Sequence, residues 1–65
     1  MTKSELQEQM NELREGFQEM ASEGFGYSEA FDIARAFTEE PGVEKAVKKH
    51  YGVDDAVEYV ANYIA

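Results

Sequence analysis

The amino-acid sequence predicts an all-α fold, a small bundle of three to four helices with a long amphipathic N-terminal helix. Apolar residues recur at helical spacing along the chain, and glycine or proline separates the segments. The 65 residues are enough for one domain at most, so we expect a single helical domain over residues 1–65. Its core is small and it has no cysteine for a disulfide, so it depends on tight helix packing or on association with another chain.

The first helix is expected from about Lys3 to Glu23. Its apolar residues alternate between spacings of four and three, as in a coiled-coil seam, and are Leu6, Met10, Leu13, Phe17 and Met20. This seam is narrower than the apolar stripe of most globular helices, so pairing with a second copy of the chain is an open alternative. Gly16 lies inside the helix at a cost of roughly 1 kcal/mol relative to alanine, and it is either a tolerated weak point or the site of a close crossing or bend.

Three shorter helices are expected after a loop at residues 25–27. Ser28 is a good N-cap for the second helix, and Pro41 ends it, because the residue before a proline avoids the helical region. Gly52 separates the third helix from the fourth. Valines at helical rather than alternating spacing favour a helix over a strand in the last segment. The expected ranges are 28–39, 43–51 and 54–64.

Acidic residues outnumber basic residues by 14 to 6, which gives a net charge of -8. This balance argues against direct contacts with nucleic acid and against binding to an anionic membrane surface, and it favours a basic protein partner. The chain begins without an apolar secretory segment and has no apolar run of the ~20 residues that span a bilayer. We therefore expect a cytoplasmic protein.

No constellation in the sequence indicates catalysis. The single histidine, His50, has neither a second histidine nor a cysteine to complete a site, and it suits the C-terminus of a helix. The carboxylate pairs Glu39-Glu40 and Asp54-Asp55 are adjacent in sequence, so the two side chains of a pair do not face each other on a helix. Phosphate-binding loops, zinc spacings, calcium loops and nucleophile elbows are missing from the sequence. We expect no enzymatic activity, no cofactor and no metal site.

The most distinctive pattern is an acidic stripe along the first helix, opposite the apolar seam. It consists of Glu5, Glu8, Glu12, Glu15 and Glu19. Like charges at this spacing each destabilise a helix by roughly 0.2–0.5 kcal/mol. The stripe is either the solvated outer face of an acidic protein or a binding surface for a basic partner. Its carboxylates follow one another at about 5 Å along the axis, close to the phosphate spacing of a nucleic acid, so a DNA mimic also fits. Small acidic viral inhibitors of host proteins resemble the chain in size and charge.

Four aromatic residues are candidate anchors for a protein partner. They are Phe25, Tyr27, Tyr59 and Tyr63. The first two flank a glycine in the loop after the first helix. The two C-terminal tyrosines lie one helical turn apart, outside the apolar stripe of the last helix. They either form an exposed interface patch, which suits tyrosine, or pack against the first helix.

Part of the chain resembles a ubiquitin-associated domain. The residues that carry the resemblance are Met20, Gly24-Phe25, Ser28, Ala30, Ala34, Phe37 and Gly42-Val43-Glu44-Lys45-Ala46-Val47. Members of that family have a Met-Gly-Phe-type loop and a final helix that opens with Asn-Val-x-x-Ala-Val. Here the methionine is separated from the Gly-Phe pair, the gap before the last helix is longer, and a fourth helix follows. The resemblance covers about half of the chain and implies that the loop at 24–27 and the third helix contact a partner.

These patterns together predict a small acidic protein–protein interaction module without enzymatic activity. It would inhibit a basic or nucleic-acid-binding protein by covering its surface, with the acidic stripe accelerating association. One alternative is a structural or assembly subunit that homo-oligomerises through its N-terminal helix, and another is a ubiquitin-associated-like binding domain. A dimer sealed along the apolar seam would favour the structural subunit.

Overall fold

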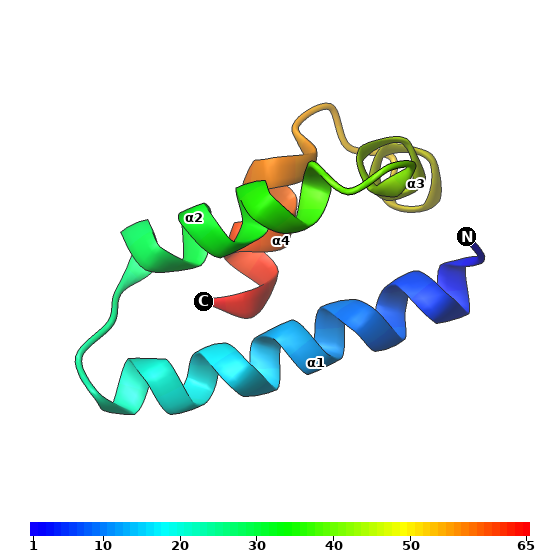
Figure 1. Cartoon of the computed structure of the whole chain (residues 1–65). Coiled ribbons are helices and arrows are strands. Elements are labelled where there is room, and N and C mark those ends of the chain that lie inside the picture. The colour runs from blue at the N-terminus through cyan, green and yellow to red at the C-terminus, as the bar shows by residue number, and fades with distance from the viewer.

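The computed structural model describes all 65 residues and contains four α-helices and no strand (Figure 1). The helices are α1 (Lys3–Ser22), α2 (Tyr27–Thr38), α3 (Val43–Tyr51) and α4 (Ala56–Ile64). The predictions of an all-α fold and of a long N-terminal helix are confirmed. None of the four helices combines the length and the apolar character that a membrane crossing requires.

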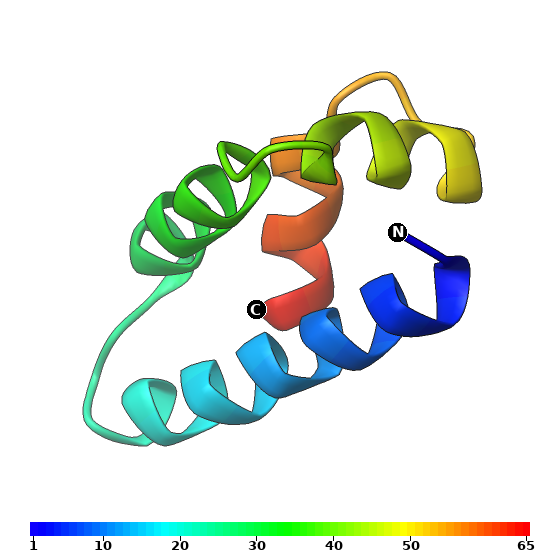
Figure 2. The same cartoon turned by 45° about the vertical axis from the view of Figure 1, so that its right-hand side comes forward.

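α4 is the central helix of the bundle. It runs between α1 and α2 and contacts all three other helices, whereas α1 and α2 hardly touch each other (Figure 2). Glu58 is its only charged residue. Its buried residues are Ala56, Val60, Ala61 and Ile64. α3 covers the end of the bundle that holds the N-terminus. The core is therefore arranged around the last segment of the chain.

The apolar seam of α1 serves the core of its own chain. Leu6, Met10 and Phe17 are buried against the other helices. Leu13 and Met20 are half-buried and lie on the side of α1 that faces α2. A coiled-coil dimer along the whole seam would require the three buried side chains to leave this core.

The start of α1 is held by a capping box, which Thr2 and Glu5 form. The Thr2 N–H donates to the Glu5 carboxylate over 2.8 Å, and the Glu5 N–H donates to Thr2 Oγ1 over 3.1 Å. Two backbone donors that the helix itself cannot satisfy are thus paired. The first member of the acidic stripe is part of this cap.

α2 and α4 begin differently from what the sequence suggested. Gly26 and not Ser28 is the N-cap of α2, because the Glu29 carboxylate reaches back to the Gly26 N–H over 2.8 Å. The Ser28 hydroxyl donates to that same carboxylate over 3.2 Å instead of capping the helix. α4 begins later than expected, since Asp55 is its N-cap and accepts a hydrogen bond from the Glu58 N–H over 3.0 Å.

Replacing Ile64 by alanine should lower the free energy of unfolding by about 2–5 kcal/mol, because it leaves a cavity between the central helix α4 and the helices that pack on it. Ile64 is only 1% exposed. The loss is large for a domain whose total stability is roughly 3–10 kcal/mol. Urea denaturation followed by circular dichroism measures it. The control is Asn62→Ala on the exposed side of α4, which should change the value by less than about 0.5 kcal/mol. Equal effects of the two variants would contradict the central position of α4.

Candidate functional site

The acidic stripe is exposed over its whole length. All five glutamates are exposed, and they span about 21 Å of α1 at 1.5 Å per residue. The structure contains one salt bridge, between Lys48 and Glu44 of α3 at 3.6 Å. No carboxylate of the stripe therefore has a basic side chain within salt-bridge distance, and the stripe presents uncompensated negative charge.

The two basic residues of α1 lie on a different side of the helix. Lys3 Nζ lies 5.5 Å from the centre of the Tyr51 ring, and Arg14 Cζ lies 4.8 Å from the centre of the Tyr63 ring. These are cation–π contacts with α3 and α4. Because both charges face tyrosines, they do not neutralise the acidic stripe.

Tyr59 and Tyr63 are half-buried and packed inside the chain. The Tyr63 hydroxyl donates to Asn11 Oδ1 and accepts a hydrogen bond from Gln7 Nε2, so it is tied to α1. The Tyr59 ring stacks on Tyr51 of α3, with ring centres 4.9 Å apart and planes at 23°. Tyr63 thus packs against the first helix, as the second interpretation predicts, whereas the ring contact of Tyr59 is with α3. Their role in partner binding stays a prediction.

Tyr51 of α3, on which Tyr59 stacks, is also tied to α1. Its hydroxyl donates to Gln7 Oε1 over 2.8 Å. Burial raises the pKa of Tyr51, and the neighbouring Tyr59 and Tyr63 raise it further. The Tyr51 phenol therefore stays protonated at neutral pH and donates its hydrogen bond to Gln7.

Phe25 and Tyr27 are exposed, as expected for candidate anchors. They are 43% and 49% exposed, in and directly after the loop between α1 and α2. The Gly24 N–H donates to the Ala21 carbonyl and the Phe25 N–H to the Met20 carbonyl, over 3.1 and 3.2 Å. This is the Schellman arrangement, which places Gly24 at φ 103°, a conformation that favours glycine. It brings the Phe25 backbone next to the last turns of α1.

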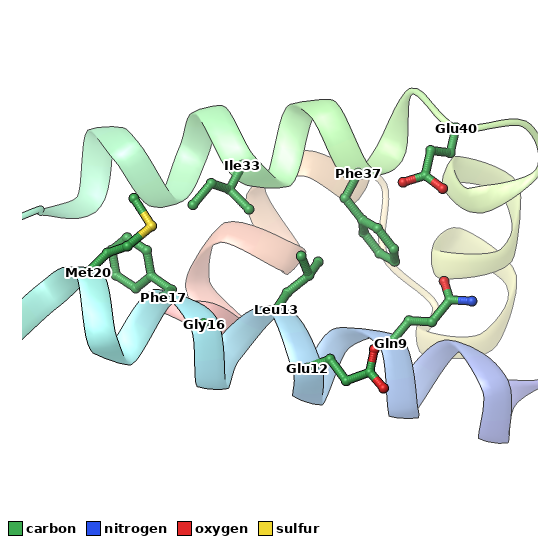
Figure 3. Close-up of a pocket in the computed structure, with 9 residues that line it drawn as sticks. All are labelled: Gln9, Glu12, Leu13, Gly16, Phe17, Met20, Ile33, Phe37 and Glu40. Carbon is green, nitrogen blue, oxygen red and sulfur yellow. The ribbon is translucent and has the colours of Figure 1, made fainter.

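An apolar groove lies between α1 and α2, where the two helices stay apart. Its volume is about 550 Å³. The residues that line it are Gln9, Glu12, Leu13, Gly16, Phe17, Met20, Ile33, Phe37 and Glu40 (Figure 3). Glu12 is the member of the acidic stripe that lines the groove, so the stripe and the groove are neighbouring parts of one surface. Sequence reasoning missed this groove, although the half-buried Leu13 and Met20 belong to the seam that it singled out.

Gly16 opens onto this groove. A Cβ atom built on Gly16 would have no atom within 4 Å. The interpretation of this glycine as the site of a close helix crossing within the chain is therefore wrong. Its backbone forms part of the groove wall, in the same turn as Leu13 and Phe17.

The remaining titratable groups form no comparable site. A second hollow of about 520 Å³ lies at the turn between α2 and α3, and Val57 is its one apolar lining residue. His50 Nε2 lies 3.3 Å from the Met1 carbonyl oxygen. No three side chains of the types His, Cys, Asp and Glu are grouped closely enough to hold a metal ion.

Comparisons with protein-family models, with curated proteins and with solved structures find no match to this chain. The resemblance to a ubiquitin-associated domain therefore stays an expectation from the sequence. The features of the surface that bear on function are the acidic stripe, the groove and the exposed aromatic residues between α1 and α2.

Acidification should destabilise the wild-type protein relative to the Glu5→Gln variant. Hydrogen bonds from Thr2, first from its backbone N–H and then from its side chain, hold the pKa of the Glu5 carboxyl below its ordinary value of 4.5. A carboxyl with a lowered pKa in the folded state contributes stability above its unfolded pKa and loses it as the pH falls through the folded pKa. Glutamine can fill the same place in a capping box but does not titrate.

We therefore expect the difference in the free energy of unfolding between wild type and Glu5→Gln to be constant at neutral pH. Below a pH of about 4.5 it should shift steadily in favour of the variant. Urea denaturation at a series of pH values measures this difference. A difference that is the same at neutral pH and at about pH 3 would show that the capping carboxylate is not specifically stabilised.

Replacing Gly16 by alanine should raise the free energy of unfolding by about 0.5–1 kcal/mol, since the new methyl group meets open space and alanine has the higher helix propensity. Gly24→Ala is the matched control. Its Cβ would also meet no atom within 4 Å, but φ at Gly24 is 103°, so this substitution should be destabilising. Thermal unfolding compares the two variants. A destabilised Gly16→Ala protein would mean that the groove wall is not open at this point.

Proposed function

We propose that the chain is a small acidic protein–protein interaction module that binds a basic protein partner and inhibits it by covering its surface. The observation that carries the proposal is the acidic stripe, whose five exposed carboxylates have no salt-bridge partner in the chain. The partner is a protein with a basic surface, and a nucleic-acid-binding protein belongs to this class. The chain itself contacts neither nucleic acid nor membrane in this proposal.

Charge separation within α1 supports this function. Like charges at helical spacing cost stability, and nearby lysine or arginine side chains would relieve that cost. The basic residues of α1 instead contact Tyr51 and Tyr63 on another side of the helix. An uncompensated stripe of this kind attracts a positively charged surface over several ångströms and speeds up its association.

The homo-oligomeric alternative receives less support. It relied on a free apolar seam along α1, but Leu6, Met10 and Phe17 are buried in the core of their own chain. In addition, two copies would bring together surfaces with a net charge of -8 each. Such like-charge contacts oppose association.

The test removes charge from the acidic stripe without touching the groove. In the triple variant Glu8→Gln, Glu15→Gln and Glu19→Gln, helicity should be retained or raised, because like-charge repulsion is relieved. Tagged wild type and variant serve as bait in an extract of the native host at low and at high salt. Proteins retained by the wild type should be basic, should be released by high salt and should bind the variant about tenfold less tightly.

The control is a second triple variant with the same change in net charge at positions outside α1, Asp32→Asn, Glu39→Gln and Glu58→Gln. These three residues are also exposed. It should retain most of the binding, because the proposal depends on where the charge lies and not only on its amount. If the stripe variant binds the retained proteins as tightly as the wild type, the proposed function is wrong.

A further inference from the structure

We propose that the groove between α1 and α2 is a docking site for an amphipathic helix of a partner protein that carries a basic residue at one end. This inference rests on the proposed function, because the same basic partner supplies the helix. The proposed function involves only attraction between charged surfaces. The groove provides a specific binding site, and its ligand is a basic amphipathic helix.

The dimensions and the lining of the groove fit a helix. Along α1 the lining runs from Gln9 to Met20, which corresponds to about 16 Å, or three helical turns. Two helices form its walls, so a third helix can insert its side-chain ridges between them. Five of the nine lining residues are apolar. Peptide helices that bind such grooves use apolar residues at positions i, i+3 or i+4, and i+7.

One end of the groove is apolar and the other is polar and acidic. This difference determines the orientation in which a helix binds. Phe17 and Met20 lie at one end, next to Ile33, whereas Gln9 and Glu40 lie at the other (Figure 3). The exposed Phe25 belongs to the loop that joins α1 and α2 beyond Met20. A bound helix therefore places its apolar anchors near the loop.

The acidic end of the groove selects a basic residue. The side chains of Glu12 and Glu40 line it, from α1 and from the turn that follows α2, and neither forms a salt bridge within the chain. A lysine or arginine on the bound helix, about two to three turns from its apolar anchors, lies at this acidic end. Ion pairs of this kind fix the register and the direction of binding more than they add affinity.

Gly16 allows the ligand to come close. It is part of the lining of α1, and a Cβ atom built on it would meet no atom within 4 Å. Without a side chain at this position, the backbones of α1 and the bound helix can approach each other more closely than over any larger residue. A small residue on the ligand opposite Gly16 would match it.

A second copy of this chain is the poorer occupant. Each copy has a net charge of -8, and the groove is bordered by Glu12 and Glu40. An incoming copy has few cations to offer, since the basic residues of its longest helix contact its own tyrosines. Charge complementarity therefore favours a basic helix from another protein.

The experiment selects ligands from a displayed library of helical peptides of about 18 residues, long enough to be helical in water. The library has a fixed apolar seam and randomised residues elsewhere. Peptides that bind the wild-type protein should carry lysine or arginine at one end. The Gly16→Leu variant changes no charge but fills the groove wall, and it should weaken their binding by about tenfold or more. The matched control is Gln18→Leu, an exposed position outside the groove lining, which should leave binding unchanged.

A charge reversal provides a second test that does not alter the apolar lining. Glu40 is exposed, so Glu40→Lys should fold normally. A repeated selection against this variant should enrich aspartate or glutamate in place of the basic residue at that end of the peptides. Circular dichroism of all variants verifies that each is folded.

Each contrary outcome overturns the groove proposal in a distinguishable way. If selected peptides bind Gly16→Leu as well as wild type but lose affinity for the Glu8, Glu15 and Glu19 triple variant, the groove is not the site and the proposed function stands. If no peptide is enriched, the groove does not bind helices of this kind. If sedimentation equilibrium shows a dimer that Gly16→Leu dissociates, the occupant is a second copy. If neither Gly16→Leu nor the triple variant changes the affinity of the selected peptides, both proposals are wrong.

Discussion

The architecture depends on the burial of α4 between two other helices. α4 has nine residues and a length of about 13 Å, whereas α1 has 20 residues and a length of about 30 Å. Each of the two neighbouring helices packs on α4 more than on the other. A short central helix cannot fill the space between two longer ones over their whole length. The groove is therefore a direct consequence of how the small core is built.

The same arrangement divides α1 into sides with separate tasks. One side is buried in the core, and a second is a polar side on which Gln7 and Asn11 bind the tyrosine hydroxyls of α3 and α4. The basic residues of α1 belong to this second side, where cation–π contacts hold them. The third side carries only the carboxylates of the acidic stripe. Negative charge accumulates there because the positive charges of the helix serve the packing of the bundle.

The sequence was sufficient for the helices, because helical periodicity is a local property. Caps were harder, since several polar side chains compete for the same backbone donors. At α2 the Glu29 carboxylate takes the Gly26 N–H, and Ser28 becomes its hydrogen-bond donor instead of the cap. The groove could not be predicted, because Leu13 and Met20 are indistinguishable in sequence from the buried members of their seam. Which of these residues is covered depends on where α4 ends, a property of the tertiary packing.

Two features of α1 are unfavourable for the isolated chain, and they lie side by side. Gly16 weakens the helix without any crowding in the fold to require it, and the glutamates around it repel one another. Glu12 and Gly16 are separated by one helical turn and line the same groove. Departures from local stability rules occur where a protein meets its ligand more often than elsewhere. Tolerated defects would be expected at unrelated positions, whereas a groove that admits a basic helix requires both an open wall and a negative border in one place.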